Sequence, residues 1–331
     1  MNKLLTIVIP SYNAEKFLNH GIPSFLDEKI LDAIEILIVD DGSKDNTASI
    51  ADSYQLKYPS TITAIHKENG GHGSTINTGI ANAHGKYFCV VDADDWVDTD
   101  NFVNLVEKLS AIDVDLVLAP AAIVNSDNKV LGYEKIKGLP VNTIIDLDNY
   151  IQNVPVIYMH NYYIKTNILK SFNIKCHEHH FYVDEEYVMF SLLHAKTVFL
   201  LDSVIYQYWV GRDGQSVSIA SRRKNMGQYL DIVNYLSDFY YSNKSKMTKN
   251  QQLHYQGKIA LFTSGVYSTL MSYNTSDKKQ QLKKFDLELK EKYPDIYHAN
   301  RNLCVSLLRI SKFSLYRLCS QVYRTVNHIH D

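Results

Sequence analysis

Three carboxylates crowd the end of a short apolar run in this chain. Tyr87–Trp96 reads Tyr-Phe-Cys-Val-Val-Asp-Ala-Asp-Asp-Trp, so Asp92, Asp94 and Asp95 follow a segment with strand character. Carboxylates this close repel one another unless a positive charge lies among them. Mg²⁺ or Mn²⁺ meets this need, because hard cations prefer oxygen ligands and commonly bridge carboxylates to the phosphates of a nucleotide. The run therefore predicts a metal-assisted nucleotide site.

The composition limits the classes of protein that this chain can be. With 331 residues, 45% of them hydrophobic and 21% charged, it is long enough for one large domain or for a catalytic domain with an appendage. A formal net charge of -2 provides no basic field, which argues against nucleic acid as a partner.

The cysteines and the N-terminus indicate a protein that stays inside the cell. The four cysteines lack the spacing of a disulfide scaffold or a zinc finger, so we expect reduced packing residues in a cytosolic protein. The apolar run Thr6–Pro10 is too short and too rich in β-branched residues for a signal peptide or a membrane span. We expect a cytoplasmic location.

The first half of the chain alternates apolar runs with amphipathic stretches. The runs are nearly continuous in Val, Ile and Leu, as in strands buried on both faces of a parallel sheet, so the predicted class is α/β. Strands are expected over Leu4–Ile9, Ile34–Val39 and Ile62–Ile65, and helices from about Glu15, Thr47 and Ser74.

Polar residues close the predicted strands. Pro10-Ser11-Tyr12-Asn13 closes the first, Asp40-Asp41-Gly42-Ser43 the second, and the aspartate cluster a later one. Ligands of open α/β sheets bind beyond the carboxyl ends of the strands, so these residues should meet at one edge. Asp40 could accept a hydrogen bond from a base ring N–H there, whereas Ser43–Thr47 also fits a plain turn with Thr47 as a helix cap.

A glycine-rich loop, Asn69-Gly70-Gly71-His72-Gly73-Ser74, precedes the third predicted helix. Its glycines allow close approach of the backbone to a ligand, and a helix N-terminus favours anionic phosphate. The loop lacks the P-loop lysine pattern and the dinucleotide fingerprint, so neither an NTPase nor a dehydrogenase is favoured.

Together these motifs resemble those of the family 2 glycosyltransferases, which have a GT-A fold. Thr6–Asn13 looks like the opening strand of that family, Ile38–Thr47 like its second-strand motif, and Asp92-Ala93-Asp94-Asp95 like its metal motif. One departure is Ile76, which stands before Asn77 where many relatives have an arginine. A contact to the donor diphosphate is expected to be missing there.

The resemblance implies roles for individual residues. Asp40 would contact uracil, Asp92 the ribose or nearby diphosphate, and Asp94 would be the principal metal ligand. Asp95 would either assist the metal or cap the next helix. The other residues expected at the nucleotide are Pro10, Tyr12, Asn13, Gly71, Asn77 and Ala93.

A catalytic base is also required, because an acceptor hydroxyl must lose its proton as it attacks the sugar. Phe181–Tyr187 carries Asp184, Glu185 and Glu186 at the start of a helical pattern, where negative charge also favours the helix itself. The resemblance implies that Asp184 is the base. Since the usual Glu-Asp pair is replaced by Val183-Asp184, Glu185 is the alternative.

Two further segments are candidates for the site. Tyr206–Val210 is a strand-like aromatic run, and the loop after it carries Arg212 and Ser216, which could clamp the leaving diphosphate as a lid or form a plain surface loop. Cys176–His180 holds metal-binding atoms but no spaced partner pair, so acceptor contact or a third metal ligand fits better than structural zinc. His160 is left open, and most of the 24 tyrosines are expected to be packing residues.

Helical patterns replace the βαβ rhythm after about Ser221. They cover Met226–Tyr241, Gln251–Tyr273, Lys278–Lys292 and Asn302–Val326. We expect a catalytic domain over residues 1–220, with a nucleotide-sugar part to about 120 and an acceptor part over 121–220, and a helical module over 221–331. The last helix is basic and amphipathic, so it could lie at the inner face of the membrane, pack on the catalytic domain or form a homo-oligomer.

The sequence thus predicts an inverting glycosyltransferase that uses Mn²⁺ or Mg²⁺ and a UDP-sugar. The sugar would be a hexose, with glucose first, or an N-acetylhexosamine, and the acceptor a glycan of a surface polysaccharide, glycoprotein or lipid-linked saccharide. Two alternatives stay open. One is a catalytically silent glycan-binding or partner subunit; the other is a sugar nucleotidyltransferase, whose Gly-rich basic loop after the first strand is absent here.

Overall fold

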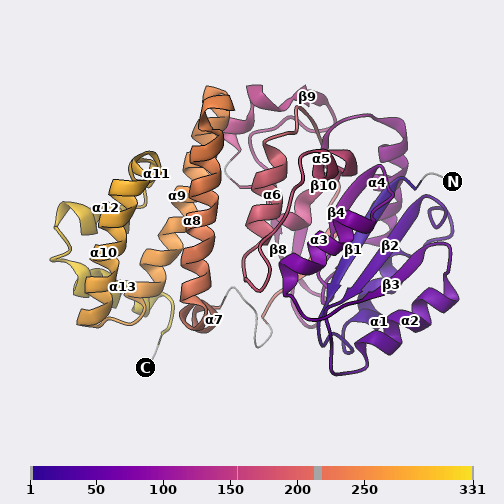
Figure 1. Cartoon of the computed structure of the whole chain (residues 1–331), viewed down its shortest axis with the longest axis horizontal. Coiled ribbons are helices and arrows are strands. Elements are labelled where there is room, and N and C mark those ends of the chain that lie inside the picture. Colours follow the sequence, from indigo (N-terminus) through magenta and orange to yellow (C-terminus); the bar gives the residue numbers. More distant parts are fainter. Residues whose placement is uncertain (1–2, 155, 212–217, 330–331) are drawn as a thin grey trace. The chain divides into compact units, whose positions relative to one another are not determined.

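The computed structural model describes residues 3–154, 156–211 and 218–329. The chain forms two compact units, Met1–Asp213 and Gly214–Asp331. The first unit is α/β and the second is helical, as the alternation of patterns predicts (Figure 1). The roles given to these parts stay predictions: a catalytic domain over residues 1–220, divided near residue 120 into a nucleotide-sugar part and an acceptor part, and a helical module over 221–331.

An eight-stranded sheet forms the centre of the first unit, in the order β3-β2-β1-β4-β10-β6-β11-β9. Strands β1, β2, β3 and β4 run parallel, whereas β10 is antiparallel to β4 and β6, and β9 is antiparallel to β11. A four-stranded sheet has the order β5-β12-β7-β8. The strands are β1 Leu5–Ser11, β2 Ile34–Asp40, β3 Ile62–His66, β4 Tyr87–Val90, β5 Trp96–Val97, β6 Leu116–Leu118, β7 Ala121–Val124, β8 Val130–Glu134, β9 Ile144–Asp146, β10 Tyr162–Lys165, β11 Thr197–Leu200 and β12 Tyr206–Trp209.

Helices accompany the strands of the first unit. The α-helices there are α1 Leu18–Gly21, α2 Thr47–Lys57, α3 His72–Asn82, α4 Thr99–Ala111, α5 Thr166–Ser171 and α6 Asp184–Leu192. Short 3-10 helices cover Ile22–Phe25, Leu147–Asn149, Ile151–Asn153 and Met159–Asn161.

Strand β1 shows how the sheet is buried on both faces. Leu5, Ile7 and Ile9 belong to the core cluster that also contains residues of α1, α2 and α4. Val8 points to the opposite face, where α3 packs so closely that a Cβ added to Gly79 would lie 2.4 Å from Val8 Cγ2. Alternation along the strand therefore places a helical layer on each side of the sheet.

Two local predictions in the first unit were wrong. The first helix begins at Leu18, not near Glu15, and is a single turn before a 3-10 helix. Asn46, not Thr47, is the N-cap of α2. The Thr47 hydroxyl instead accepts a hydrogen bond of 2.7 Å from the Ala14 backbone N–H, so it ties the ends of β1 and β2 together.

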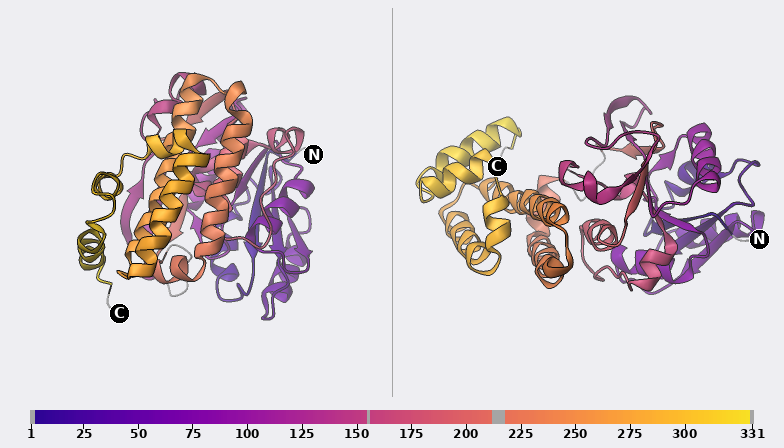
Figure 2. Two further views of the ribbon diagram at one scale, coloured as in Figure 1. Left: turned by 60° about the vertical axis from the view of Figure 1, so that its left-hand side comes forward. Right: turned by 90° about the horizontal axis from the view of Figure 1, so that it is seen from above.

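The second unit consists of helices. They are α7 Ile219–Lys224, α8 Met226–Asn243, α9 Lys249–Met271, α10 Ser276–Lys292, α11 Pro294–Ala299, α12 Leu303–Ile310 and α13 Tyr316–Val326, with a 3-10 helix at Lys244–Lys246. The long helices α8 and α9 lie side by side, as Figure 2 shows. The single helix predicted over Asn302–Val326 is two helices, because Lys312 and Phe313 adopt positive φ angles of 48° and 63° between them. Within the described residues, no helix combines the length and hydropathy that a membrane span requires.

The close approach of α3 to β1 predicts a stability effect. We expect Gly79→Ala to lower the free energy of unfolding by about 1–3 kcal/mol, because the added methyl group must displace Val8 in a packed core. Gly257→Ala, in α9, is the matched control: no heavy atom lies within 4 Å of its added Cβ, so it should stabilise by about 0.5–1 kcal/mol. Urea unfolding measures the free energy of unfolding of both variants. Equal changes in the two would contradict the close packing of α3 on β1.

Candidate active site

The loops after β1 and β2 are locked to each other by backbone and side-chain hydrogen bonds. Asn13, with φ of 50°, donates its N–H to Ser43 Oγ at 2.9 Å, and its side-chain oxygen accepts the Lys44 N–H at 2.9 Å. Pro10 and Ser11 pair with Val39 and Asp40 in the sheet. Asn13 therefore shapes the loop that the sequence assigned to the nucleotide, and Tyr12 is 54% exposed beside it.

Asp40 lies at the end of β2, where the sequence places it. Its carboxylate is almost fully buried; Oδ1 accepts the Ser43 N–H at 3.0 Å, and Oδ2 lies 3.2 Å from Nδ1 of His66. His66 is the residue directly opposite Asp40 in the β2–β3 register. Sequence reasoning could not select His66, because its contact with Asp40 depends on strand pairing.

Asp41 anchors the glycine-rich loop. Its buried carboxylate accepts the N–H groups of Gly70 and Gly71 at 2.9 and 2.8 Å and the Lys67 ammonium at 2.9 Å. Gly71 is the N-cap of α3 and has a φ of 81°, a conformation that favours glycine. Asp41 follows Asp40 in the predicted motif, yet its own role could not be read from a turn-like sequence.

The histidine-rich segment packs against this loop. The His179 N–H donates to Gly70 O at 2.6 Å, and a Cβ on Gly73 would lie 2.1 Å from His177 O. Asn77 uses both ends of its amide on the backbone of Cys176, at 2.9 Å each. Asn77, expected at the nucleotide, thus holds the histidine-rich segment against α3.

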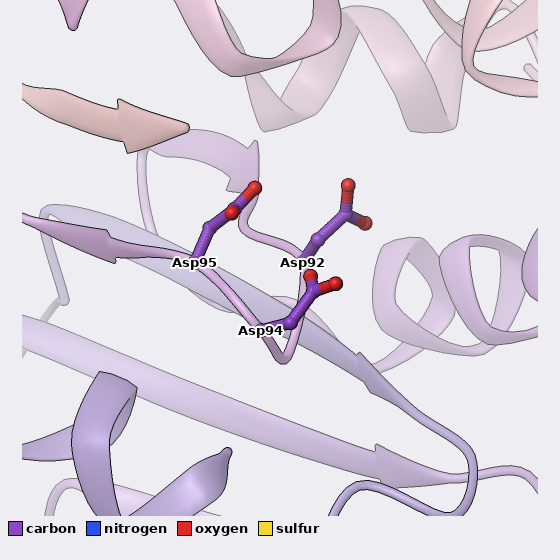
Figure 3. Close-up of side chains that lie close together, drawn as sticks. All are labelled: Asp92, Asp94 and Asp95. Carbon is purple, nitrogen blue, oxygen red and sulfur yellow. The ribbon is translucent and has the colours of Figure 1, made fainter. Parts of the chain in front are cut away.

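The three aspartates rise from one turn between β4 and β5 (Figure 3). One oxygen from each lies within 4.8 Å of the others. Asp95 is 2% exposed and accepts hydrogen bonds from Tyr206 Oη at 2.7 Å and the Trp209 N–H at 2.8 Å. Asp98, not Asp95, is the N-cap of α4, so the alternative of Asp95 as a helix cap was wrong.

The electrostatics of this cluster indicate missing positive charge. Partial burial, together with repulsion from Asp94 and Asp184, raises the pKa of Asp92 to about 6. Burial and the neighbouring carboxylates also raise the pKa of Asp95. The nearby cation candidate is His72, whose Nε2 lies 3.8 Å from Asp92 Oδ1. Closely spaced oxygen donors with raised pKa values fit a hard divalent cation such as Mg²⁺ or Mn²⁺.

Helix α6 brings the acidic run toward the cluster. Asp184 is its first residue and half-buried, and its charge contributes to the raised pKa of Asp92. Glu186 is fully buried and accepts both the His177 N–H, at 2.8 Å, and His177 Nδ1, at 2.7 Å. The two carboxylates of this run therefore have different surroundings: Glu186 fixes the histidine-rich segment, and the charge of Asp184 acts on the aspartate cluster.

Backbone strain marks the approach to α6. His179 and Tyr182 have φ angles of 58° and 67°, which cost energy for residues with a Cβ. Such conformations persist where the surrounding contacts fix them, and they gather at binding and catalytic sites. Here they lie between the glycine-rich loop and Asp184.

An aromatic ladder lies beside the aspartates. The His160 ring stacks with Tyr158 and with Tyr208, at centroid distances of 5.3 Å each, and His160 Nε2 hydrogen-bonds Glu134. The charge of His160 acts to lower the pKa of Asp92. Ala93 lies within the aspartate turn, whereas Arg212 and Ser216 lie outside the described residues.

The fold, with its acidic residues beyond the strand ends, is that of the GT-A glycosyltransferases. Residues 6–172, half of the chain, match the family described as glycosyl transferase family 2. The chain belongs to this family and is a glycosyltransferase.

Relatives and solved structures agree with this assignment. "Uncharacterized glycosyltransferase EpsJ" of Bacillus subtilis is 28% identical over 267 residues, which cover 79% of this chain and 70% of that protein. Glycosyltransferase GlyG of Streptococcus pneumoniae is 34% identical over 36% of this chain and 39% of its own length. The fold resembles that of S. aureus TarS 1-349, solved in complex with UDP-GlcNAc, with a TM-score of 0.70, 19% identity, and 97% and 92% of the two chains covered.

The raised pKa of Asp92 predicts a pH-dependent effect on stability. Below the ordinary pKa near 3.8, Asp92 is protonated in both the folded and the unfolded chain and does not lower the free energy of unfolding. As the pH rises from there through about 6, its ionisation increasingly lowers that free energy. We expect Asp92→Asn to raise the free energy of unfolding at pH 7.5 in EDTA by about 1 kcal/mol, a figure reduced for solvent screening. The gain should shrink toward pH 4.

Urea unfolding across that pH range measures the effect, with Asp100→Asn in the first turn of α4 as the control. If the stabilisation by Asp92→Asn instead grew as the pH fell, the raised pKa of Asp92 would be contradicted.

Proposed function

We propose that this glycosyltransferase transfers a hexose or N-acetylhexosamine from a UDP-sugar to a hydroxyl of a glycan, with inversion and with a divalent cation. The observation that carries the proposal is the aspartate cluster: beyond the end of β4, one oxygen from each carboxylate lies within 4.8 Å of the others, and the charge of Asp184 on α6 acts on Asp92. TarS has been solved with UDP and with UDP-GlcNAc, which supports a uridine donor.

Asp94 and Asp92 would hold the cation, with Asp95 fixed behind them by Tyr206 and Trp209. A mannosyltransferase of the same fold, with a TM-score of 0.53, was solved with GDP-Man and Mn²⁺, which supports Mn²⁺ or Mg²⁺. When bound, the cation neutralises charge on the departing diphosphate. The donor sugar stays open between glucose, our first candidate, and N-acetylglucosamine.

Asp184 would act as the base. The acceptor oxygen forms a bond to the anomeric carbon from the face opposite the diphosphate, and the bond from that carbon to the phosphate oxygen breaks. The hydroxyl proton passes to Asp184, and UDP leaves with the bonding electron pair. Glu186 supports this geometry because its bonds to His177 hold the segment that leads into α6.

The roles of Asp94 and Asp184 can be tested without knowing the acceptor. Slow hydrolysis of a UDP-sugar panel with Mn²⁺ reports turnover with water as acceptor. We expect Asp184→Asn to lower the hydrolysis rate by about 10²-fold or more, because proton transfer is lost. Asp94→Asn should lower it by a similar factor and raise the Mn²⁺ concentration needed for half-maximal rate.

Glu185→Gln is the matched control, since it removes the neighbouring carboxylate of the same helix turn and should keep near wild-type hydrolysis. A loss in Glu185→Gln with hydrolysis retained in Asp184→Asn would transfer the base assignment to Glu185. UDP binding without turnover of any donor would instead support a silent partner subunit, and pyrophosphate release from UTP a nucleotidyltransferase.

We also propose that α12 and α13 contact an anionic membrane surface. Leu303, Leu307 and Ile310 share one face of α12 and are 82%, 50% and 81% exposed. On α13, Leu318 and Val322 are 58% and 56% exposed at helical spacing. Residues 301–329 contain five Lys or Arg and no Asp or Glu, so two copies of this surface would repel each other, whereas anionic lipid would attract it.

Co-sedimentation with vesicles of phosphatidylglycerol and phosphatidylcholine tests this contact. We expect Ile310→Glu to lower the partition coefficient about tenfold, because a charge replaces an exposed apolar side chain that would enter the lipid. Leu56→Glu, on a leucine of α2 that is 85% exposed, should leave partition unchanged. A dimer in sedimentation equilibrium that Ile310→Glu dissociates, without vesicle binding, would assign the surface to self-association.

A further inference from the structure

A carboxylate–imidazole–carboxylate chain joins three elements of the first unit at the end of β2. His66 Nδ1 lies 3.2 Å from Asp40 Oδ2, and His66 Nε2 lies 3.0 Å from Asp52 Oδ1. The three residues come from β3, β2 and α2. Asp40 is buried and Asp52 is exposed, so the chain runs from the interior to solvent.

Both ring nitrogens of His66 face a carboxylate oxygen. An imidazolium can donate to both, and the hydrogen bonds to Asp52 and then to Asp40 raise the pKa of His66. Because His66 and Asp40 are directly paired across the two strands, the sheet register fixes the distance between them. The ring therefore restrains one oxygen of Asp40, while the Ser43 N–H restrains the other at 3.0 Å.

These two restraints leave the Asp40 carboxylate little freedom to rotate. Each carboxylate oxygen can accept more than one hydrogen bond, so a further donor can still be accepted at the small part of Asp40 that remains accessible. In uracil that donor is the N3–H, whereas cytosine has an unprotonated N3 at the same place. A fixed carboxylate distinguishes the two bases better than one that rotates.

We infer that His66 is a positioning residue for base recognition: it holds Asp40 in the orientation that selects uracil over cytosine. The inference rests on the proposed UDP-sugar donor and on Asp40 as its uracil contact. It assigns to His66 a role in donor selectivity and no part in the transfer step itself.

The experiment is isothermal titration of the full chain, with Mn²⁺ present, using UDP, CDP and pyrophosphate. Pyrophosphate lacks a base and reports only the diphosphate side of the site. For His66→Ala we expect the UDP dissociation constant to rise about tenfold, in line with loss of a charge-assisted restraint, while CDP and pyrophosphate change less than twofold. His66→Gln, which keeps an N–H donor, should recover most of the preference for UDP.

His84→Ala is the matched control. His84 also pairs with a carboxylate, Glu35, at the same 3.2 Å, but at the turn before β4, so all three dissociation constants should stay at wild-type values. A His66→Ala protein that binds UDP as tightly as wild type would overturn the inference. Equal losses for UDP, CDP and pyrophosphate would also overturn it, because they would show a structural role.

The same titrations distinguish a wrong donor assignment from a wrong role for His66. If the wild-type protein itself shows no preference for UDP over CDP, or binds neither, the uridine donor is wrong. If the wild type prefers UDP and His66→Ala keeps that preference, only the inference about His66 is wrong.

Discussion

The buried carboxylate of Asp41 is the interaction on which the rest of the site depends. It receives two backbone N–H groups and an ammonium, and it thereby fixes the glycine-rich loop to the end of β2. That loop holds His179 through Gly70 O, and the same segment is held by Glu186 through His177. A continuous set of hydrogen bonds thus leads from the expected uracil side of the site to α6. A buried charged group without hydrogen-bond partners is costly, so each of these groups stays with its partner. Each hydrogen bond thereby restrains the segment that carries the next one.

The aspartate cluster is built in the opposite manner. Asp41 has its counter-charge in Lys67, whereas burial and the neighbouring carboxylates raise the pKa of Asp92 and that of Asp95. Tyr206 and Trp209 donate hydrogen bonds to the carboxylate of the most buried member, Asp95, and Tyr206 also accepts the Asp92 backbone N–H at 3.1 Å. The carboxylates of the cluster repel one another, and this repulsion lowers the stability of the folded protein. A bound cation would relieve the repulsion, so the folded state should bind cations favourably.

The strands of the first unit and the acidic turn could be predicted from the sequence because they depend on local patterns of residues. Apolar runs gave the parallel strands and their polar ends, and the acidic turn after β4 was found from its charge alone. The roles of His66, Asp41 and Glu186 could not be found in this way, since each depends on a partner from another element. The break between α12 and α13 was missed for a different reason: the helical pattern continues through Lys312 and Phe313, while their positive φ angles interrupt the helix.

Contacts between distant segments also decide the roles of Ile76 and Asn77, where the sequence departs from the family motif. Ile76 is fully buried, so an arginine at this position could not remain in the same packing and reach a phosphate. Asn77 is committed at both ends of its amide to Cys176, which holds the histidine-rich segment where the glycine-rich loop needs support. The group of α3 that lies near the aspartates is instead His72, on the first turn of the helix, whose Nε2 is 3.8 Å from Asp92 Oδ1. Helix α3 thus places an imidazole on one face and a fixed anchor on another, where an arginine would add a permanent charge. Under the proposed mechanism, attraction for a diphosphate then depends more heavily on the proposed cation at the aspartates.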